Sequence, residues 1–216
     1  MLKKLAGEFI GTLLLLTMIV GSGIMATNLS SDVGVQLMIN VFSIISLLFV
    51  IIIIFGPISG AHFNPVVTIS ELFLKRINAT TAALYIAAQF IAAFLGTVLA
   101  NFMFNKPLIF SSHHNRDGLP ILLGEVIATA GLLAIIAILR AQNKPGWTPI
   151  TIAAWIGSAC FFTSSTSFAN PAVTVARAWS DTFAGIAPHS VLPFVLAQVI
   201  GACMGLLLAK GITRVR

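Results

Sequence analysis

Long uninterrupted runs of apolar residues alternate with short polar segments along this chain. The apolar runs lie at about 5–26, 35–55, 79–104, 119–139, 149–162 and 191–209. Runs of this length predict membrane-spanning helices, because ~20 helical residues cover the ~30 Å hydrocarbon core and satisfy every backbone polar group internally. A β-barrel would instead need alternating segments of ~10 residues. The pattern therefore predicts an all-α membrane protein with six transmembrane helices.

Two further segments do not fit a simple count of spans. Segments 59–65 (SGAHFNP) and 166–171 (TSFANP) are polar, and each leads into an apolar stretch too short to cross a membrane. Asn is a favoured helix N-cap, and Pro is favoured at the first helical position, where its missing N–H costs nothing. Asn64-Pro65 and Asn170-Pro171 therefore predict the starts of two re-entrant half-helices.

The two halves of the chain resemble each other. Three landmarks recur in the same order, GEFIGT at 7–12 with GEVIAT at 124–129, NPVVTI at 64–69 with NPAVTV at 170–175, and AQFIAA at 88–93 with AQVIGA at 197–202. This order indicates an internal repeat. About three spans per half is an odd number, so the second half enters the membrane from the opposite side. We expect one domain over 1–216, with inverted repeats at about 1–105 and 119–216.

Composition and charge exclude several classes of protein. The chain is 58% hydrophobic and 8% charged, with a mean hydropathy of +1.02, whereas soluble domains are roughly 45–50% apolar and 25% charged. A soluble globular enzyme and a disordered chain are both excluded. The net charge is +6, but no basic stripe interleaved with aromatic residues is present, so we expect no nucleic-acid partner.

The positions of the basic residues predict an orientation. Nine of the twelve fall on one side if the spans alternate, and only Lys106, Arg116 and Arg177 fall on the other. The positive-inside rule then places both termini in the cytoplasm and segment 105–118 outside. His113, His114 and Arg116 in that segment are expected to be solvated. The first apolar run is long enough to be a retained span rather than a cleaved signal peptide.

The two half-helices predict a narrow pore. Their N-termini would bring two positive dipole ends to the bilayer centre, and non-helical backbone at that depth is tolerated where it lines a wet cavity. The asparagines supply donors and the preceding carbonyl groups supply acceptors, which suits small neutral solutes and opposes cations. The segment residues expected to line the pore are Gly60, Ala61, His62, Phe63, Phe168 and Ala169.

These motifs resemble the aquaporin (major intrinsic protein) superfamily along nearly the whole chain. The resemblance rests on 59–65 and on Asn170-Pro171-Ala172, with Val66 where the family usually has Ala. It implies six spans plus two half-helices, a pore in each subunit and a homotetramer. We expect no cofactor, and we expect no metal site because the chain has no cluster of Cys and His residues. The resemblance also implies that Glu8 and Glu125 brace the re-entrant segments by accepting backbone N–H bonds. A proton relay is the alternative for acids inside a membrane.

One position departs from the family pattern. Most members carry an arginine directly after the second Asn-Pro-Ala, projecting into an outer constriction, and here that residue is Val173. Spacing from the Asn-Pro motifs adds Ile44, Ser158 and Ser167 to the constriction. We therefore expect a wider, uncharged selectivity constriction.

Arg177 lies one helical turn beyond Val173. Three roles are open to it, at the outer mouth of the pore, in a pair with Asp181 four residues on, or extended to the membrane interface.

Residues 161–177 and 180–185 resemble a bacterial subgroup linked to arsenic resistance. That resemblance implies passive passage of arsenous acid, its methylated relatives and some water across the bacterial inner (plasma) membrane. The alternative is an ordinary water or glycerol channel, although Thr174 stands where glycerol facilitators usually carry Asp. An alternating-access transporter is less favoured, since the spans lack paired acids and bases for coupling. An enzyme is also less favoured, because no nucleophile–base set or metal cluster is present.

Overall fold

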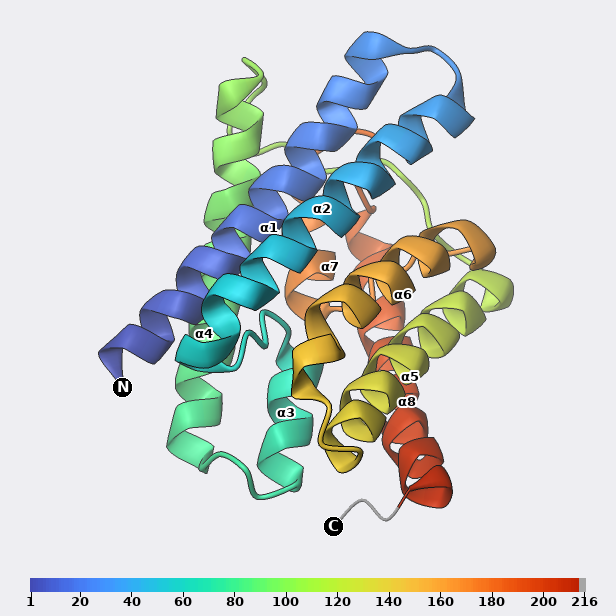
Figure 1. The fold of residues 1–216 in the computed structure, drawn as a ribbon. Helices are drawn as coiled ribbons and strands as arrows, with labels where there is room; N and C mark the ends of the chain where they lie inside the picture. Colours follow the sequence, from blue (N-terminus) through green and yellow to red (C-terminus); the bar gives the residue numbers. More distant parts are fainter. Residues whose placement is uncertain (214–216) are drawn as a thin grey trace.

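The computed structural model describes residues 1–213 and is helical throughout its regular elements (Figure 1). In chain order these elements are α1 Leu2–Leu29, α2 Val33–Ser59, α3 Pro65–Phe73, α4 Ala79–Met103, α5 Leu119–Ala141, the 3₁₀ turn η1 Pro145–Trp147, α6 Thr148–Phe162, α7 Pro171–Arg177 and α8 Pro188–Ile212.

The six predicted spans correspond to six helices, with differences at their ends. Helix α2 runs on to Ser59, past the predicted end at 55, with Pro57 inside it. It stops at Gly60, whose φ of 95° is a left-handed conformation that glycine adopts without strain. Within residues 1–213, five helices are long and apolar enough to cross a membrane by length and composition, whereas α6 has 15 residues and extends about 22 Å.

The two short helices begin where the Asn-Pro motifs predict. Asn64 Oδ1 accepts a hydrogen bond from Val66 N at 3.1 Å at the start of α3. Asn170 Oδ1 accepts from Ala172 N at 3.0 Å and from Val173 N at 3.3 Å at the start of α7. With nine and seven residues, α3 and α7 are too short to span a bilayer.

Glycines let the long helices pack closely in the same way in both halves. In α4, a Cβ on Gly96 would lie 2.4 Å from the Leu13 carbonyl oxygen of α1. In α8, a Cβ on Gly205 would lie 2.2 Å from the Ala130 carbonyl oxygen of α5. Small residues at such crossings allow backbones to approach, which drives packing in lipid. The pairs α1–α4 and α5–α8 therefore frame the two halves.

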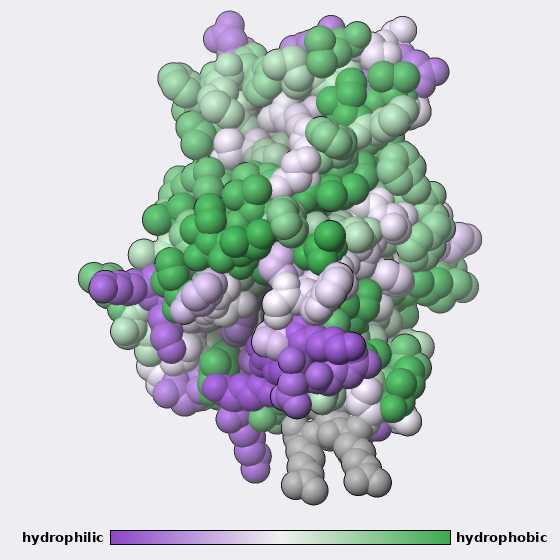
Figure 2. All heavy atoms as spheres, in the orientation of Figure 1, coloured by the Kyte–Doolittle hydropathy of each residue, from purple (hydrophilic) through white to green (hydrophobic). Residues whose placement is uncertain are grey.

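The outside of the helix bundle is apolar. Large side chains on its surface are exposed, for example Phe42 at 72% and Leu207 at 69%. Figure 2 shows a largely hydrophobic middle, with hydrophilic residues gathered toward the two ends. Such a surface suits contact with lipid, and the protein is a multi-pass membrane protein. Helix α1 begins, and α8 finishes, toward the same end of the bundle (Figure 1).

Candidate functional site

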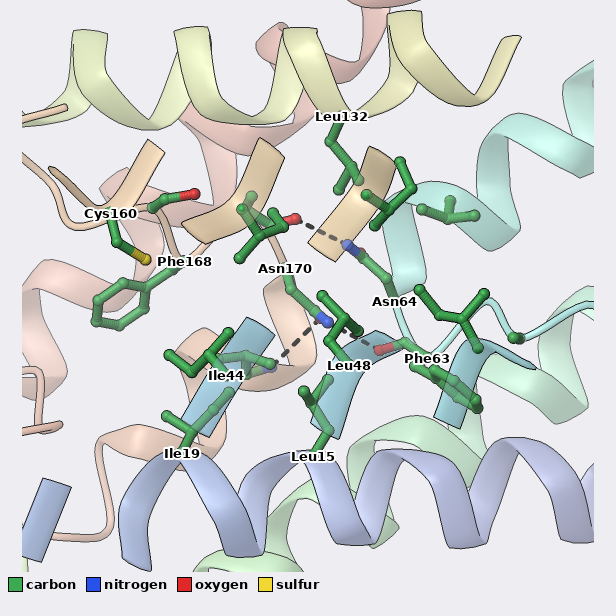
Figure 3. A pocket seen from close by; sticks show the side chains of 18 of the residues that line it. Leu15, Ile19, Ile44, Leu48, Phe63, Asn64, Leu132, Cys160, Phe168 and Asn170 are labelled. Carbon is green, nitrogen blue, oxygen red and sulfur yellow. Dashed lines mark hydrogen bonds between the residues drawn. The ribbon is translucent and has the colours of Figure 1, made fainter. Parts of the chain in front are cut away.

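One continuous cavity of about 1010 Å³ runs through the centre of the bundle (Figure 3). We call the end lined by Gln36 and Arg116 the outer mouth, and the end lined by Arg140 and Gly146 the inner mouth. Asn64 and Asn170 line the cavity between them. The names follow the orientation that the basic residues predict.

The two asparagines join the half-helices at the middle of this cavity. Asn64 Nδ2 donates to the Ala169 carbonyl at 2.8 Å, and Asn170 Nδ2 donates to the Phe63 carbonyl at 2.8 Å. These bonds are drawn in Figure 3. A carboxamide nitrogen carries two hydrogens, so each asparagine keeps a second N–H available to a solute in the cavity.

Two buried acids hold the non-helical segments from behind. Glu8 accepts from His62 N at 2.9 Å and from Phe63 N at 2.8 Å. In a trans peptide the carbonyl points opposite to the N–H, so the carbonyls of Ala61 and His62 point away from Glu8. These residues line the cavity, and their oxygens are therefore presented to it as acceptors.

Glu125 does the same in the second half. It accepts from Phe168 N at 2.8 Å and from Ala169 N at 2.9 Å. The carbonyls of Ser167 and Phe168 consequently point away from Glu125. With both carboxylates committed to backbone donors, the contacts suit the bracing role better than a proton relay.

Two glutamines complete this bracing, and sequence reasoning missed their role. Gln89 Nε2 donates to Glu8 at 2.8 Å and to Thr68 at 2.9 Å. Gln198 Nε2 donates to Glu125 at 2.6 Å and to the Thr174 hydroxyl. The repeated Ala-Gln landmark at 88–89 and 197–198 was the signal that could have identified them.

The wall facing the polar segments is aliphatic. It is contributed by α1, α2, α5 and α6, and it consists of Leu15, Ile19, Leu48, Ile52, Leu132, Ile136, Ile152 and Ile156. These eight side chains offer no hydrogen bonds, although polar residues of the same helices, such as Asn40 and Thr148, also line the cavity.

Three of the four predicted constriction residues line the cavity, and one does not. Ile44, Ser167 and Val173 line it. Ser158 is exposed and lies at a shallow depression on the outer surface, so its placement in the constriction was wrong. The physical reason is that 163–169 is not helical, so counting back from Asn170 loses the helical phase.

The face of α6 that meets the cavity carries Ile152, Ile156 and Cys160, which are spaced four residues apart. Ser158 is two residues from Cys160 and therefore about 200° around the helix. Figure 3 shows Cys160 among the residues that line the cavity. In this part of α6, Cys160 and not Ser158 thus lines the cavity.

Arg177 lines the cavity and is 6% exposed. Its Nε donates to the Ala184 carbonyl, and its guanidinium lies 3.4 Å from the centroid of the Phe168 ring. It does not pair with Asp181, which instead accepts from His113 N at 2.9 Å and contacts His113 Nδ1 at 3.0 Å. Of the three roles open to Arg177, the position at the outer mouth fits this geometry.

Arg116 corrects a second expectation, because it is not a solvated loop residue. Its Nε donates to the Gly185 carbonyl at 2.9 Å, and its Nη1 donates to the Thr166 hydroxyl at 3.3 Å. It lines the cavity beside Arg177. Burial lowers the pKa of Arg116 to about 10, so the side chain stays charged at neutral pH.

The inner mouth is organised around one buried acid. Glu71, near the end of α3, forms ion pairs with Arg76 at 3.0 Å and with Arg140. Glu71, Arg140 and His62 line this end of the cavity. His62 is held by a contact of 3.0 Å between its Nδ1 and the Thr68 hydroxyl. Glu71 therefore neutralises one of the two arginine charges at the inner mouth.

Comparison with known proteins gives consistent matches. Residues 1–169 match the family described as major intrinsic protein. Aquaglyceroporin AqpS of Rhizobium meliloti (strain 1021) is 39% identical over 209 residues, which is 96% of this chain and 89% of that protein. Aquaporin Z of Photorhabdus laumondii is 28% identical over 171 residues, covering 70% of this chain and 72% of that protein.

A solved structure shares the fold. The X-ray structure of the aquaglyceroporin from Plasmodium falciparum superposes with a TM-score of 0.69 at 20% sequence identity. The match covers 98% of this chain and 96% of that one.

Proposed function

The chain belongs to the major intrinsic protein family, and from that premise we propose that its preferred solute is arsenous acid. The protein is a passive channel for water and small solutes, and it is not an enzyme. The proposal concerns which small neutral solute passes best, and it includes methylated relatives of arsenous acid.

The observation that carries the proposal is that Ile44, Ser167 and Val173, all uncharged, line the cavity. Val173 lies directly after the Asn-Pro-Ala motif, is 3% exposed and lines the cavity. A valine there leaves more room than a longer cationic side chain would, and it adds no charge. A solute bulkier than water therefore meets a smaller steric barrier at this level.

The chemistry of arsenous acid matches the rest of the cavity. The molecule is neutral near pH 7 and has three hydroxyl groups that donate and accept hydrogen bonds. The free N–H groups of Asn64 and Asn170 supply donors, and the carbonyls of Ala61, His62 and Ser167 supply acceptors. These donors and acceptors replace the hydrogen bonds that the solute loses to water, so the free-energy cost of desolvation is offset along one wall of the cavity.

Glycerol is the second candidate, because it too is a neutral molecule with three hydroxyl groups. The relative from Rhizobium meliloti is an aquaglyceroporin by name, which favours a solute larger than water. An ordinary water channel is the third candidate. The three differ in the size of the solute that passes, so flux measurements separate them.

The proposal includes an assembly and a location. We propose a homotetramer in a bacterial plasma membrane with both termini in the cytoplasm, since nine basic residues would then face inward. Arg214 and Arg216 of that set lie outside the described residues. The other seven are Lys3, Lys4, Lys75, Arg76, Arg140, Lys144 and Lys210.

The test is solute flux in liposomes that contain the purified protein, with protein-free liposomes as the control. We expect arsenous acid uptake well above the control, with a rate that rises linearly with concentration. Osmotic water flux and glycerol uptake are measured in the same preparation. Fast water flux with arsenous acid at the control rate would refute the metalloid proposal, and saturating uptake would indicate a transporter instead.

A further inference from the structure

The outer mouth holds two guanidinium groups against one aromatic ring. The Cζ atom of Arg177 lies 3.4 Å, and that of Arg116 4.9 Å, from the centroid of the Phe168 ring. All three residues line the cavity. We propose that Arg116 and Arg177, held on Phe168, form the barrier that excludes cations from this channel, displaced outward from the uncharged position of Val173.

The charges of these two arginines are not neutralised by a carboxylate. Within residues 1–213, no ion pair includes Arg116 or Arg177. Asp117 contacts Ser190 and His189, and Asp181 contacts His113. Glu125 accepts from Phe168 N, Ala169 N and Gln198. The two guanidinium groups therefore line the cavity with no carboxylate of the described residues in contact with either of them.

The contacts that hold the two side chains preserve that charge. Arg116 donates to the Gly185 carbonyl and to the Thr166 hydroxyl, and Arg177 donates to the Ala184 carbonyl. Neutral acceptors fix the position of a guanidinium without cancelling its charge, and the face of an aromatic ring adds cation–π attraction. Both groups are thus fixed and charged at the edge of the cavity.

A cation entering here is repelled by two fixed charges in partly dehydrated surroundings, where Coulomb repulsion is stronger than in water. A neutral solute feels no such repulsion. It also meets Ser167 Oγ, which is buried, lines the cavity and has no hydrogen-bond partner within the described structure. The same mouth can therefore reject cations and admit neutral hydroxyl compounds.

The inner mouth does not provide an equivalent barrier. Arg140 lines it, but Arg140 and Arg76 both pair with Glu71. Glu71 cancels one of these two charges, so the group of three has one excess positive charge and a weaker field than two unpaired guanidinium groups. This contrast provides a control, because Arg76→Gln also removes an arginine but leaves the outer mouth unchanged.

The test is potassium current across planar bilayers containing the purified protein, with osmotic water flux measured in liposomes from the same preparation. The variants are Arg116→Gln with Arg177→Gln, the two corresponding lysine substitutions together, and Arg76→Gln. We expect the double glutamine variant to pass at least about tenfold more potassium current than the wild type. The double lysine and Arg76→Gln variants should pass as little potassium current as the wild type, and measurable water flux shows that each variant forms an open pore.

Two results would overturn the inference. One is a double glutamine variant that conducts water but still blocks potassium. The other is a double lysine variant that leaks as much as the double glutamine variant, because packing rather than charge would then form the barrier. If the double variants do not fold, Arg116→Gln against Arg116→Lys makes the same comparison, with an intermediate leak expected only for glutamine. The test does not measure arsenous acid flux, so its result does not depend on whether arsenous acid is the preferred solute.

Discussion

Asn64 and Asn170 each donate a hydrogen bond to the residue that precedes the other, at 2.8 Å in both directions. Their side-chain oxygens meanwhile cap the half-helices α3 and α7. Each asparagine therefore fixes its own helix and the segment leading to the opposite helix. This reciprocal arrangement makes the middle of the cavity a single unit.

Asn170→Ala should affect both stability and flux. The substitution removes one cap bond each to Ala172 and Val173 and the bond to Phe63, which we expect to lower the free energy of unfolding by about 2 kcal/mol. Water flux should fall as well, because a donor in the cavity is lost. Thermal unfolding in detergent and stopped-flow water flux measure the two effects.

Asn78→Ala is the matched control. Asn78 caps α4 by accepting from Thr81 N at 2.8 Å, but it is exposed and not among the residues that line the cavity. We expect Asn78→Ala to remove the cap of α4, as Asn170→Ala removes the cap of α7, and to leave water flux unchanged. Equal flux losses in the two variants would show that the asparagines act only as caps.

Close helix packing gives a second prediction, with a control on the same helix. Gly205→Ala would place a Cβ 2.2 Å from the Ala130 carbonyl oxygen, whereas a Cβ on Gly211 meets nothing within 4 Å. We expect Gly205→Ala to cost at least about 2 kcal/mol of stability, because α5 and α8 must move apart. Gly211→Ala should be neutral or slightly stabilising. Similar melting temperatures for the two variants would contradict the packing.

The placement of Cys160 predicts sensitivity to mercury. Cys160 lines the cavity, whereas Cys203 is exposed on α8. Thiols bind soft metal ions strongly, so Hg²⁺ bound at Cys160 should block the cavity. Water flux of the wild type and of Cys203→Ala should fall at least about fivefold with mercuric chloride. Water flux of Cys160→Ala should be insensitive to mercuric chloride. If Cys203→Ala is the insensitive variant instead, the placement of Cys160 in the cavity is contradicted.

The contact between Asp181 and His113 predicts an acid response of segment 105–118. The backbone and side-chain hydrogen bonds from His113 hold the pKa of Asp181 below its ordinary value. A depressed pKa in the folded state gives stability that is present above the unfolded pKa of about 3.9 and is lost as the pH falls through the folded value. The hydrogen bonds between Asp181 and His113 should therefore persist at neutral pH and break below about pH 4.

A spin label at exposed Asn115 reports this release. We use Asn115→Cys in a background with both native cysteines replaced by alanine. Label mobility should rise on acidification, while Asp181→Asn should be mobile at every pH. The free-energy change is at most about 1 kcal/mol because the pair is partly exposed. A label that responds to acid equally in both proteins would contradict the assignment.

Much of the fold follows from the sequence, because lipid makes apolar run length a direct measure of a spanning helix. The half-helices were equally predictable, since Asn-Pro is a local signal for a helix start. The end of α2 was harder to predict. Pro57 suggests an earlier stop, yet the helix continues to Ser59 and ends at Gly60.

The candidate site was only partly predictable. Ile44, Ser167 and Val173 line the cavity, but Ser158 does not. The segment before Asn170 is not helical, so counting residues back from Asn170 pointed to the wrong face of α6. Arg116 was missed because its position depends on long-range contacts with the Gly185 carbonyl and Phe168. No local pattern in segment 105–118 indicates that its arginine folds back into the bundle.

The central claim is that the uncharged position at Val173 admits arsenous acid, and Val173→Arg tests it most directly. The measurement is the ratio of arsenous acid permeability to water permeability in liposomes, for the wild type and the variant. A guanidinium at that level narrows the cavity and leaves room for water, so we predict that the ratio falls about tenfold. An unchanged ratio, whether both fluxes fall equally or neither falls, would contradict the claim.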